Sequence, residues 1–377
     1  MICLNLRALA NNHEKPQPLM NSDLTIILTL KGRFNYTRRW LDWAISRNCP
    51  FKILIADGGL DDSVQQYLST LEPNNLNLEY VRYPPDLSLK EWFAKISDVT
   101  QRVETKYAIL ADNDDFLFFD RLALATEEME NNGGTRLYTA PYYCMNFDIT
   151  GSKNIDIDAL VKPTKGIYFK KSSIANFSRY NDKSLINRFE HVLNHLPSAF
   201  FWYGIHLSSE LHKTHSTILK GGVSLAMIQE WYLSYRAVIK DSICYDEHSL
   251  PYLVRQEQTS EAGSVLAKTE APHRIFLNSS WSDDLDFMIR TLYSDAVDEG
   301  LTMPFTEFEL FFKKHFENYF LTGSRFAYLS LINNKYIKVV KYVYRAITYL
   351  RSRVSINKYS SDPEIVELKQ FLANFKL

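Results

Sequence analysis

Short apolar runs alternate with amphipathic stretches along the first third of the chain. The runs are rich in β-branched residues and have the length of strands that are buried on both faces. The stretches between them repeat their apolar residues at three- and four-residue steps, which is the helical period. We predict strands over 24–30, 51–56, 76–83 and 107–111, and helices over 36–47, 63–71 and about 88–103. Strands that alternate with helices at this spacing indicate a parallel α/β sheet.

Beyond the fourth predicted strand the pattern is mixed, and it then becomes mostly helical. We predict strands over 136–143 and 166–170, a helix over 225–239, and mainly helices from about residue 284 onward. The chain therefore divides into a loosely ordered leader (1–20), an α/β domain (21–280) and a helical C-terminal region (281–377).

Charged residues follow three of the predicted strands directly. The acidic run DNDD (112–115) ends the fourth strand, Asp57 ends the second, and the loop 31–33 follows the first. Ligands of parallel α/β sheets bind beyond the carboxyl ends of the strands, so we expect these groups to meet at one edge. Adjacent carboxylates repel one another unless a cation neutralises them, and Mg²⁺ or Mn²⁺ accepts such oxygen ligands. Taken alone, the acidic run also fits a solvated turn, and Asp57 also fits a simple Asp-Gly turn or a helix cap.

Three segments together carry a resemblance to a known family. TIILTLKGRFNYTRRWLDWA, FKILIADGG and YAILADNDDFLFFDRL resemble the N-terminal half of family-two glycosyltransferases of the GT-A fold, over about residues 24–124 and less closely to about 255. The resemblance implies a Rossmann-like GT-A sheet and a nucleotide-sugar donor. It assigns recognition of the base to Asp57. It assigns the divalent metal that binds the donor diphosphate, Mn²⁺ or Mg²⁺, to Asp112 and Asp114, with Asp114 the more direct ligand.

The same resemblance implies further donor contacts. Lys95 lies on the helix before the acidic run, where the family often has an arginine that faces the nucleotide. The stretch from Thr29 to Arg33 stands where the family has Pro-Thr-Tyr-Asn-Arg, and only Arg33 keeps the family's residue. Thr29, Lys31 and Arg33 are the donor-binding candidates of this loop.

The stretch QEWYLSYR (229–236) resembles the family motif Glu-Asp-Trp-x-Leu-x-x-Arg. Glu230 stands where the family has its catalytic aspartate, so the resemblance implies that it takes the proton from the acceptor hydroxyl in a single, inverting displacement. The alternative for Glu230 is an exposed helix carboxylate. A late histidine, His248 or His273, is a further candidate for the metal shell.

The overall charge argues against one class of partner and leaves others open. The 43 basic and 44 acidic residues give a net charge of −1, which argues against a general nucleic-acid coat. The sequence has no signal peptide and no apolar run of about 20 residues, so we expect a cytoplasmic protein. Residues 335–358 form a predicted basic amphipathic helix that either packs on the domain or lies on the inner face of a membrane.

Two rivals to a glycosyltransferase remain at this stage. One is a non-catalytic sugar-nucleotide-binding or scaffold subunit, which the Gln229-Glu230 departure keeps open. The other is a sugar nucleotidyltransferase, which usually has a glycine-rich phosphate loop after its first strand. KGRFN (31–35) has a single glycine and therefore disfavours that rival. By family analogy the acceptor is a glycan or a lipid-linked saccharide.

Overall fold

The computed structural model describes most of the chain. The described residues are 23–72, 75–133, 135–146, 161, 167–174, 177–195, 198–240, 243–256, 275, 277–316, 359 and 361–376. The predicted leader (1–20), the predicted basic helix (335–358) and His273 lie outside them.

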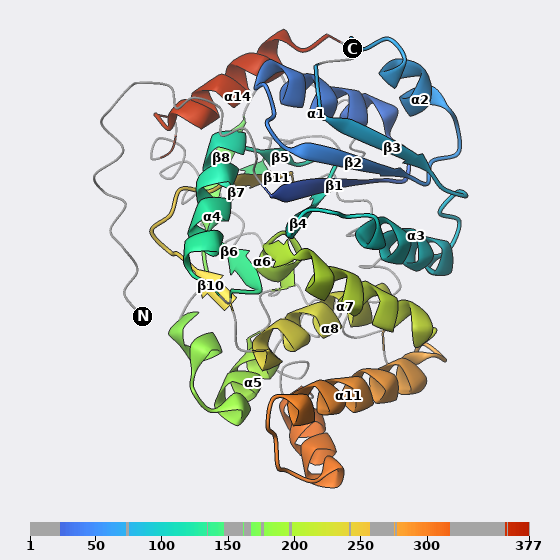
Figure 1. Ribbon diagram of the computed structural model, residues 1–377, viewed down its shortest axis with the longest axis vertical. Helices are drawn as coiled ribbons and strands as arrows, with labels where there is room; N and C mark the ends of the chain where they lie inside the picture. The colour runs from blue at the N-terminus through green and yellow to red at the C-terminus, as the bar shows by residue number, and fades with distance from the viewer. Residues whose placement is uncertain are drawn as a thin grey trace, which may run out of the picture.

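A seven-stranded sheet forms the centre of the molecule (Figure 1). Its order is β10 (Ile243–Tyr245), β6 (Leu137–Thr139), β9 (Ile205–Leu207), β4 (Tyr107–Asp112), β1 (Leu24–Leu30), β2 (Lys52–Asp57) and β3 (Leu78–Arg82). All of these strands run in one direction except β9, which is antiparallel to both of its neighbours. The four predicted N-terminal strands are thus the four neighbours β4, β1, β2 and β3.

Helices cover both faces of this sheet, which explains the continuous apolar runs of β1, β2 and β4. On one face lies α1 (Phe34–Ser46), and on the other lie α3 (Leu89–Gln101) and α7 (Ser208–Lys220) (Figure 1). Strands covered on both faces need apolar side chains at every position rather than at alternate ones. Ile26, Ile27 and Leu28 are accordingly all fully buried.

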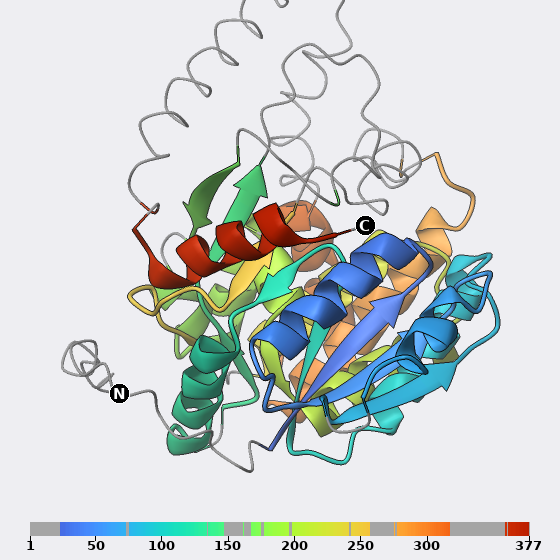
Figure 2. The same cartoon turned by 90° about the horizontal axis from the view of Figure 1, so that it is seen from above.

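A smaller sheet lies beside the acidic end of β4. Its order is β5 (Phe116–Leu117), β11 (Leu253–Arg255), β7 (Tyr142–Asn146) and β8 (Tyr168–Ser172). The C-terminal helix α14 (Pro363–Asn374) runs beside α1 (Figure 2). The Trp43 and Phe371 rings lie 5.2 Å apart, and Arg47 pairs with Glu364 at 3.1 Å. The end of the chain therefore packs against its first helix.

The other helices pack around the sheet and its covering helices. They are α2 (Ser63–Leu68), α4 (Phe119–Asn131), the 3-10 helix η3 (Phe177–Asn181), α5 (Leu185–Asn194), α6 (Ser198–Trp202), α8 (Ala226–Ile239) and α11 (Trp281–Asp298), and residues 305–316 are also helical. Helix α11 packs against α8, where the Trp231 and Trp281 rings lie 6.3 Å apart. No helix within the described ranges is both long and apolar enough to span a bilayer.

The fold class that the sequence predicts is confirmed: a mostly parallel α/β sheet flanked by helices, with a helical C-terminal region. The predicted strand over 136–143 is wrong as a single element. It is two strands, β6 and β7, that belong to different sheets. Ala140 and Pro141 separate them, and proline has no N–H to continue a ladder. The domain boundaries stay a prediction.

Candidate active site

The carboxyl ends of β4, β1 and β2 lie side by side because these strands pair in register. Thr29 of β1 is opposite Asp112 of β4, and Leu30 is opposite Asp57 of β2. The loops that follow the three strands therefore meet at one edge of the sheet, as ligand-binding loops do in parallel α/β folds. This edge is the site that the sequence predicts.

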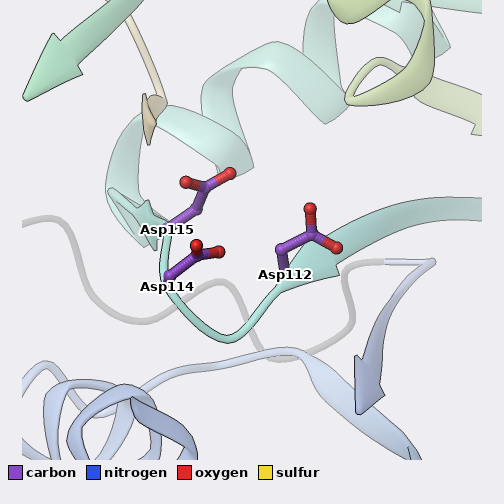
Figure 3. Close-up of side chains that lie close together, drawn as sticks. All are labelled: Asp112, Asp114 and Asp115. Carbon is purple, nitrogen blue, oxygen red and sulfur yellow. The ribbon is translucent and has the colours of Figure 1, made fainter. Parts of the chain in front are cut away.

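Three carboxylates gather at this edge. Asp112 ends β4, and Asp114 and Asp115 lie on the turn that leads into β5 (Figure 3). Each offers an oxygen, and these oxygens all lie within 4.8 Å of one another. Two unit charges at that distance repel by at least about 3 kcal/mol, for an effective dielectric constant of about 20. The cluster therefore opposes its own full ionisation.

The pKa values of Asp112 and Asp115 are raised, which also indicates that the cluster resists full ionisation. Burial, together with the Asp114 carboxylate, raises the pKa of Asp112, and the Tyr203 hydroxyl works in the opposite direction. Burial and Asp114 raise the pKa of Asp115 well above its ordinary value of 3.8. A bound cation would favour the ionised carboxylates and so oppose both pKa shifts. Hard carboxylate oxygens are the ligands that Mg²⁺ and Mn²⁺ accept. The three residues fit a divalent metal.

Side chains from distant segments hold these carboxylates in place. The Tyr203 hydroxyl donates to Asp112 Oδ2 at 2.5 Å, and the Gln256 N–H donates to Asp115 Oδ1 at 2.8 Å. The Arg255 guanidinium lies 4.0 Å from the Asp115 carboxylate and 4.8 Å from the centroid of the Tyr203 ring. Burial and Asp112 raise the pKa of the Tyr203 hydroxyl well above its usual value, so it remains a donor.

The backbone of the acidic turn is fixed by α1 and the loop before it. The Asn113 amide donates to Gly32 O at 3.1 Å and to Thr37 Oγ1 at 3.0 Å. The fully buried Arg39 donates from Nη2 to Asp114 O and to Gln256 Oε1, both at 3.0 Å. Because every one of these partners is buried or partly buried, the turn is rigid and its carboxylates are preorganised.

The predicted donor-binding loop lies directly beside the cluster. Arg33 adopts a left-handed backbone with φ of 62°, which costs a non-glycine residue about 1 kcal/mol or more. This conformation places Arg33 Nη1 3.2 Å from Asp114 Oδ2 and its guanidinium 4.3 Å from the centroid of the Tyr36 ring. Thr29 Oγ1 is 3.5 Å from Asp112 Oδ1, and Lys31 is exposed on the loop. All three predicted loop residues therefore lie at the site's edge.

Asp57 lies at the predicted edge but is enclosed by the protein. Its carboxylate accepts hydrogen bonds from the Gly59 N–H at 2.8 Å, the Tyr80 hydroxyl at 2.8 Å and Arg82 Nη1 at 2.7 Å. The Asp57 side chain is 2% exposed, whereas that of Arg82 is 29% exposed. The Asp57 carboxylate is thus shielded from solvent, and its charged partner Arg82 is partly exposed.

Lys95 faces the protein interior rather than a ligand. Its ammonium, 1% exposed, donates to Leu30 O at 2.6 Å and to the Asp86 carboxylate. Burial lowers the pKa of Lys95 and raises that of Asp86, and the attraction between the two opposes both shifts. Asp86 draws the ammonium inward, so Lys95 ties the end of β1 to the loop after β3. A role for Lys95 in donor binding stays a prediction. Because its ammonium donates to Leu30 O and Asp86, this geometry favours support of the loops over direct contact with the donor.

Glu230 is partly exposed on the first turns of α8. Its neighbour Gln229 is buried and contacts His215 Nδ1 through Nε2 at 2.8 Å, and the ring of His215 lies 5.7 Å from that of Trp202. Trp202 directly precedes Tyr203, which binds Asp112. This chain of contacts links the start of α8 to the acidic cluster. The catalytic role of Glu230 stays a prediction.

Sequence reasoning missed several residues of the site. Asp115 belongs to the acidic run, and its position directly after Asp114 is a local signal for a third metal ligand. The family resemblance implies only Asp112 and Asp114. Arg82 is opposite Asp57 in the register of β2 and β3, so a basic residue ending the next predicted strand was a usable signal. Tyr203 and Arg255 come from segments far along the chain, so their contact with the cluster depends on the tertiary fold, although Arg255 ends a Tyr-x-x-Arg pattern that resembles the family's. His248, which the sequence offers as a candidate for the metal shell, is 86% exposed, and its Nε2 lies 3.3 Å from the Glu247 carboxylate.

Comparison with known proteins gives no family assignment. No family model matches the chain, and no curated protein matches it significantly. The solved structure of S. aureus TarS matches with a TM-score of 0.48 and 12% identity, over 83% of this chain and 46% of that one. TarS 1–349 in complex with UDP-GlcNAc matches with a TM-score of 0.47 and 11% identity, over 84% and 77%.

A third solved structure is the mannosyltransferase PcManGT from Pyrobaculum calidifontis in complex with GDP-Man and Mn²⁺. It matches with a TM-score of 0.42 and 10% identity, over 95% of this chain and 86% of that one. The chain spans less than half the length of the first TarS structure. Similarity at this level assigns no activity, so the functional argument rests on the site itself.

Proposed function

We propose that the protein is a metal-dependent glycosyltransferase that moves a sugar from a nucleotide-sugar donor to a hydroxyl of a glycan or lipid-linked acceptor. The observation that carries the proposal is the cluster of Asp112, Asp114 and Asp115 at the carboxyl end of β4, with their oxygens within 4.8 Å. Negative charge gathered at the ligand-binding edge of a parallel sheet suits a divalent metal and the diphosphate that it binds.

On the donor side, Asp112 and Asp114 hold the metal, and Asp115 completes the set. When bound, the metal neutralises negative charge that develops on the departing diphosphate. Arg33 lies 3.2 Å from Asp114 and supplies a second positive group for the phosphates. Tyr203 keeps Asp112 oriented through its 2.5 Å hydrogen bond. Thr29 and Lys31 line the same edge from the β1 loop.

On the acceptor side, Glu230 takes the proton from the attacking hydroxyl in a single displacement that inverts the anomeric centre. Glu230 is partly exposed on α8. The buried contact between Gln229 and His215 fixes the backbone of α8 next to it. A positioned base of this kind contributes about a hundredfold or more to the rate.

The decisive experiment is a binding and turnover screen. We expect a nucleotide sugar with Mn²⁺ to raise the melting temperature by several degrees, since a ligand at about 100 times its Kd adds about 2.7 kcal/mol of stability. The same donor should then be transferred or hydrolysed, and excess chelator should stop the reaction. Asp61→Asn is a matched control, because Asp61 is an exposed carboxylate outside the cluster.

Each result of the screen has a definite meaning. Donor binding without turnover on any acceptor would favour the non-catalytic binding subunit. Release of pyrophosphate from a nucleoside triphosphate and a sugar phosphate would favour the nucleotidyltransferase. Undiminished transfer in excess chelator would remove the metal from the proposal.

Contact of residues 335–358 with a membrane is a separate part of the proposal. The charge of this segment suits anionic lipid head groups. The full chain should sediment with anionic vesicles at low salt and be released at high salt, and a chain that ends near residue 333 should not sediment. Failure of the full chain to bind such vesicles would remove the membrane from the proposal.

A further inference from the structure

The carboxylate of Asp57 is arranged as an anchor for another side chain. Three donors reach it, from Gly59, Tyr80 and Arg82. With its side chain 2% exposed, it has little surface left for a ligand. An enclosed carboxylate of this kind fixes its partners, and its charged partner Arg82 reaches the surface with a side chain that is 29% exposed.

The Arg82 guanidinium is held by two hydrogen bonds, and its Nη2 also lies 3.9 Å from the exposed Asp62 carboxylate. Nη1 donates to Asp57 Oδ2 at 2.7 Å, and Nη2 donates to Gly59 O at 2.8 Å. A Cβ on Gly59 would lie 3.7 Å from Arg82 Nη1 and 3.6 Å from Gly32 N, which places this guanidinium close to the loop after β1. A guanidinium has five N–H groups and no acceptor, and it stays charged in proteins. Arg82 therefore presents fixed donors at the edge of the site.

The position of Arg82 in the sheet indicates which part of a donor it would meet. β3 is three strands from β4, with β1 and β2 between them. At about 4.8 Å per strand, the backbone of Arg82 lies about 14 Å from that of Asp112, and its guanidinium, which contacts Asp57 of β2, lies about 10 Å from the acidic cluster. A diphosphate bound at the acidic cluster cannot cover that distance, so the group that reaches Arg82 is the nucleoside half of the donor.

From this geometry we infer that Arg82 selects the base of the nucleotide donor, and that Asp57 acts as its positioning residue. The inference rests on the proposed function and deepens it. A guanidinium favours a base edge that presents acceptors, such as the carbonyl oxygens of uracil or O6 and N7 of guanine. Cytosine and adenine present an exocyclic amino group, which is a donor, at the corresponding position. The protein therefore takes a uridine or guanosine donor in preference to a cytidine or adenosine one.

The test measures the affinities of UDP, GDP, CDP and ADP in the presence of Mn²⁺ by calorimetry. The wild-type protein should bind UDP or GDP at least about tenfold more tightly than CDP and ADP, since a bidentate contact discriminates by roughly that factor or more. Arg82→Ala should weaken the favoured nucleotide by about ten- to hundredfold and leave CDP and ADP within about twofold. Mn²⁺ affinity measured without nucleotide should not change, which also shows that the site has folded.

Two further variants separate base selection from a structural role. Arg82→Lys should lose most of the discrimination, because one ammonium cannot hold Asp57 and Gly59 and also meet a base edge. Asp57→Asn should reduce discrimination in the same direction, because Arg82 loses its charged anchor. Arg102→Ala is the control, since Arg102 is an exposed arginine paired with Asp98 and should leave all four affinities unchanged.

Two outcomes would overturn this inference and leave the proposed function intact. An equal loss for all four nucleotides in Arg82→Ala would show that Arg82 supports the loop or meets the sugar or phosphates. A discrimination ratio that Arg82→Ala leaves unchanged would show that another group reads the base. If the wild-type protein binds none of the four nucleotides with Mn²⁺, the proposed function fails and this inference fails with it.

Discussion

Charged groups gather at both ends of the central sheet, but the two gatherings are built differently. At the carboxyl end of β4, three carboxylates lie within 4.8 Å of one another, and the cluster forms ion pairs with Arg33 at 3.2 Å and Arg255 at 4.0 Å. Near the amino ends of β4 and β6, cations and carboxylates alternate. The second network consists of Arg136, Arg236 and Lys240 with Glu210, Asp295 and Glu299.

Four members of the second network, Arg136, Glu210, Arg236 and Lys240, line a small pocket of about 20 Å³, and the network as a whole is balanced in charge. Arg236 lies 2.6 Å from Glu210 and 3.3 Å from Asp295, and its side chain is 3% exposed. Burial lowers the pKa of His206, in the pocket wall, to about 4, so this histidine is neutral near pH 7. A network whose charges already match one another serves the fold. A cluster whose charges do not match is suited to an outside cation.

Asp114→Asn should have the largest effect, because it removes charge from the unmatched cluster. We expect transfer to fall by about a thousandfold, since metal stabilisation of the leaving group supplies several kcal/mol. Mn²⁺-dependent donor binding should weaken, while the melting temperature in chelator should not fall. Steady-state kinetics and calorimetry would check this. Activity at the level of the Asp61→Asn control would contradict the metal assignment.

Arg236→Ala should act in the opposite way, on the fold rather than on the site. It leaves the buried carboxylate of Asp295 and the half-buried Glu210 without their main partner, and breaking such a buried pair costs about 3 kcal/mol. Urea unfolding should show this loss, and nucleotide affinity of the folded protein should remain. Arg290→Ala is the matched control, because Arg290 forms an exposed pair with Asp286. A loss of nucleotide binding without a loss of stability would overturn the comparison.

The acidic end was largely predictable from the sequence, and the balanced end was not. The run YAILADNDD places carboxylates directly after a buried strand, so strand and cluster are one local signal. The partners of Arg236 lie 26 residues before it and 59 residues after it, and nothing local relates them. Tyr203 likewise meets Asp112 only because β9 brings its neighbourhood beside β4.

Asp57 and Lys95 show a second limit of the sequence pattern. Both residues lie where the resemblance expects them, at the carboxyl ends of strands or on the helix before the acidic run. Their orientation depends on Arg82 and Asp86, which decide whether each charge faces a ligand or the protein. Position along the chain follows from periodicity, but direction depends on tertiary partners.

Glu230→Gln should have the next largest effect, confined to turnover. We expect the rate of transfer to fall by about a hundredfold, the usual scale for a lost general base, while donor affinity is kept. The reason is that Glu230 lies on α8, whereas the donor's proposed ligands lie on the loops after β1, β2 and β4. Single-turnover kinetics with a saturating donor would measure it. A collapse of donor affinity would show that Glu230 contacts the donor or supports its site.

Asp115→Asn should have the smallest effect, and this effect is on stability. Whether the substitution raises or lowers the melting temperature should depend on whether the metal is bound. Burial and Asp114 raise the pKa of Asp115 in the fold above its unfolded value of 3.8. A raised pKa contributes stability below the unfolded pKa, and this contribution is lost as pH rises through the folded pKa. At neutral pH in chelator Asp115 therefore costs stability. Asparagine removes the carboxyl group and still offers Oδ1 to the Gln256 N–H.

We accordingly expect Asp115→Asn to raise the melting temperature in chelator by about 2 °C, equivalent to roughly 1 kcal/mol. With Mn²⁺ the order should reverse, because wild-type Asp115 then faces a cation and the variant has lost a ligand. The advantage in chelator should shrink as pH falls towards 4, because Asp115 then becomes protonated in the unfolded chain as well as in the fold. Scanning calorimetry of both proteins, with and without Mn²⁺, would measure all three differences. A variant less stable than wild type in chelator would show that the carboxylate is already compensated by Arg255, and the contrast between the two ends of the sheet would then be wrong.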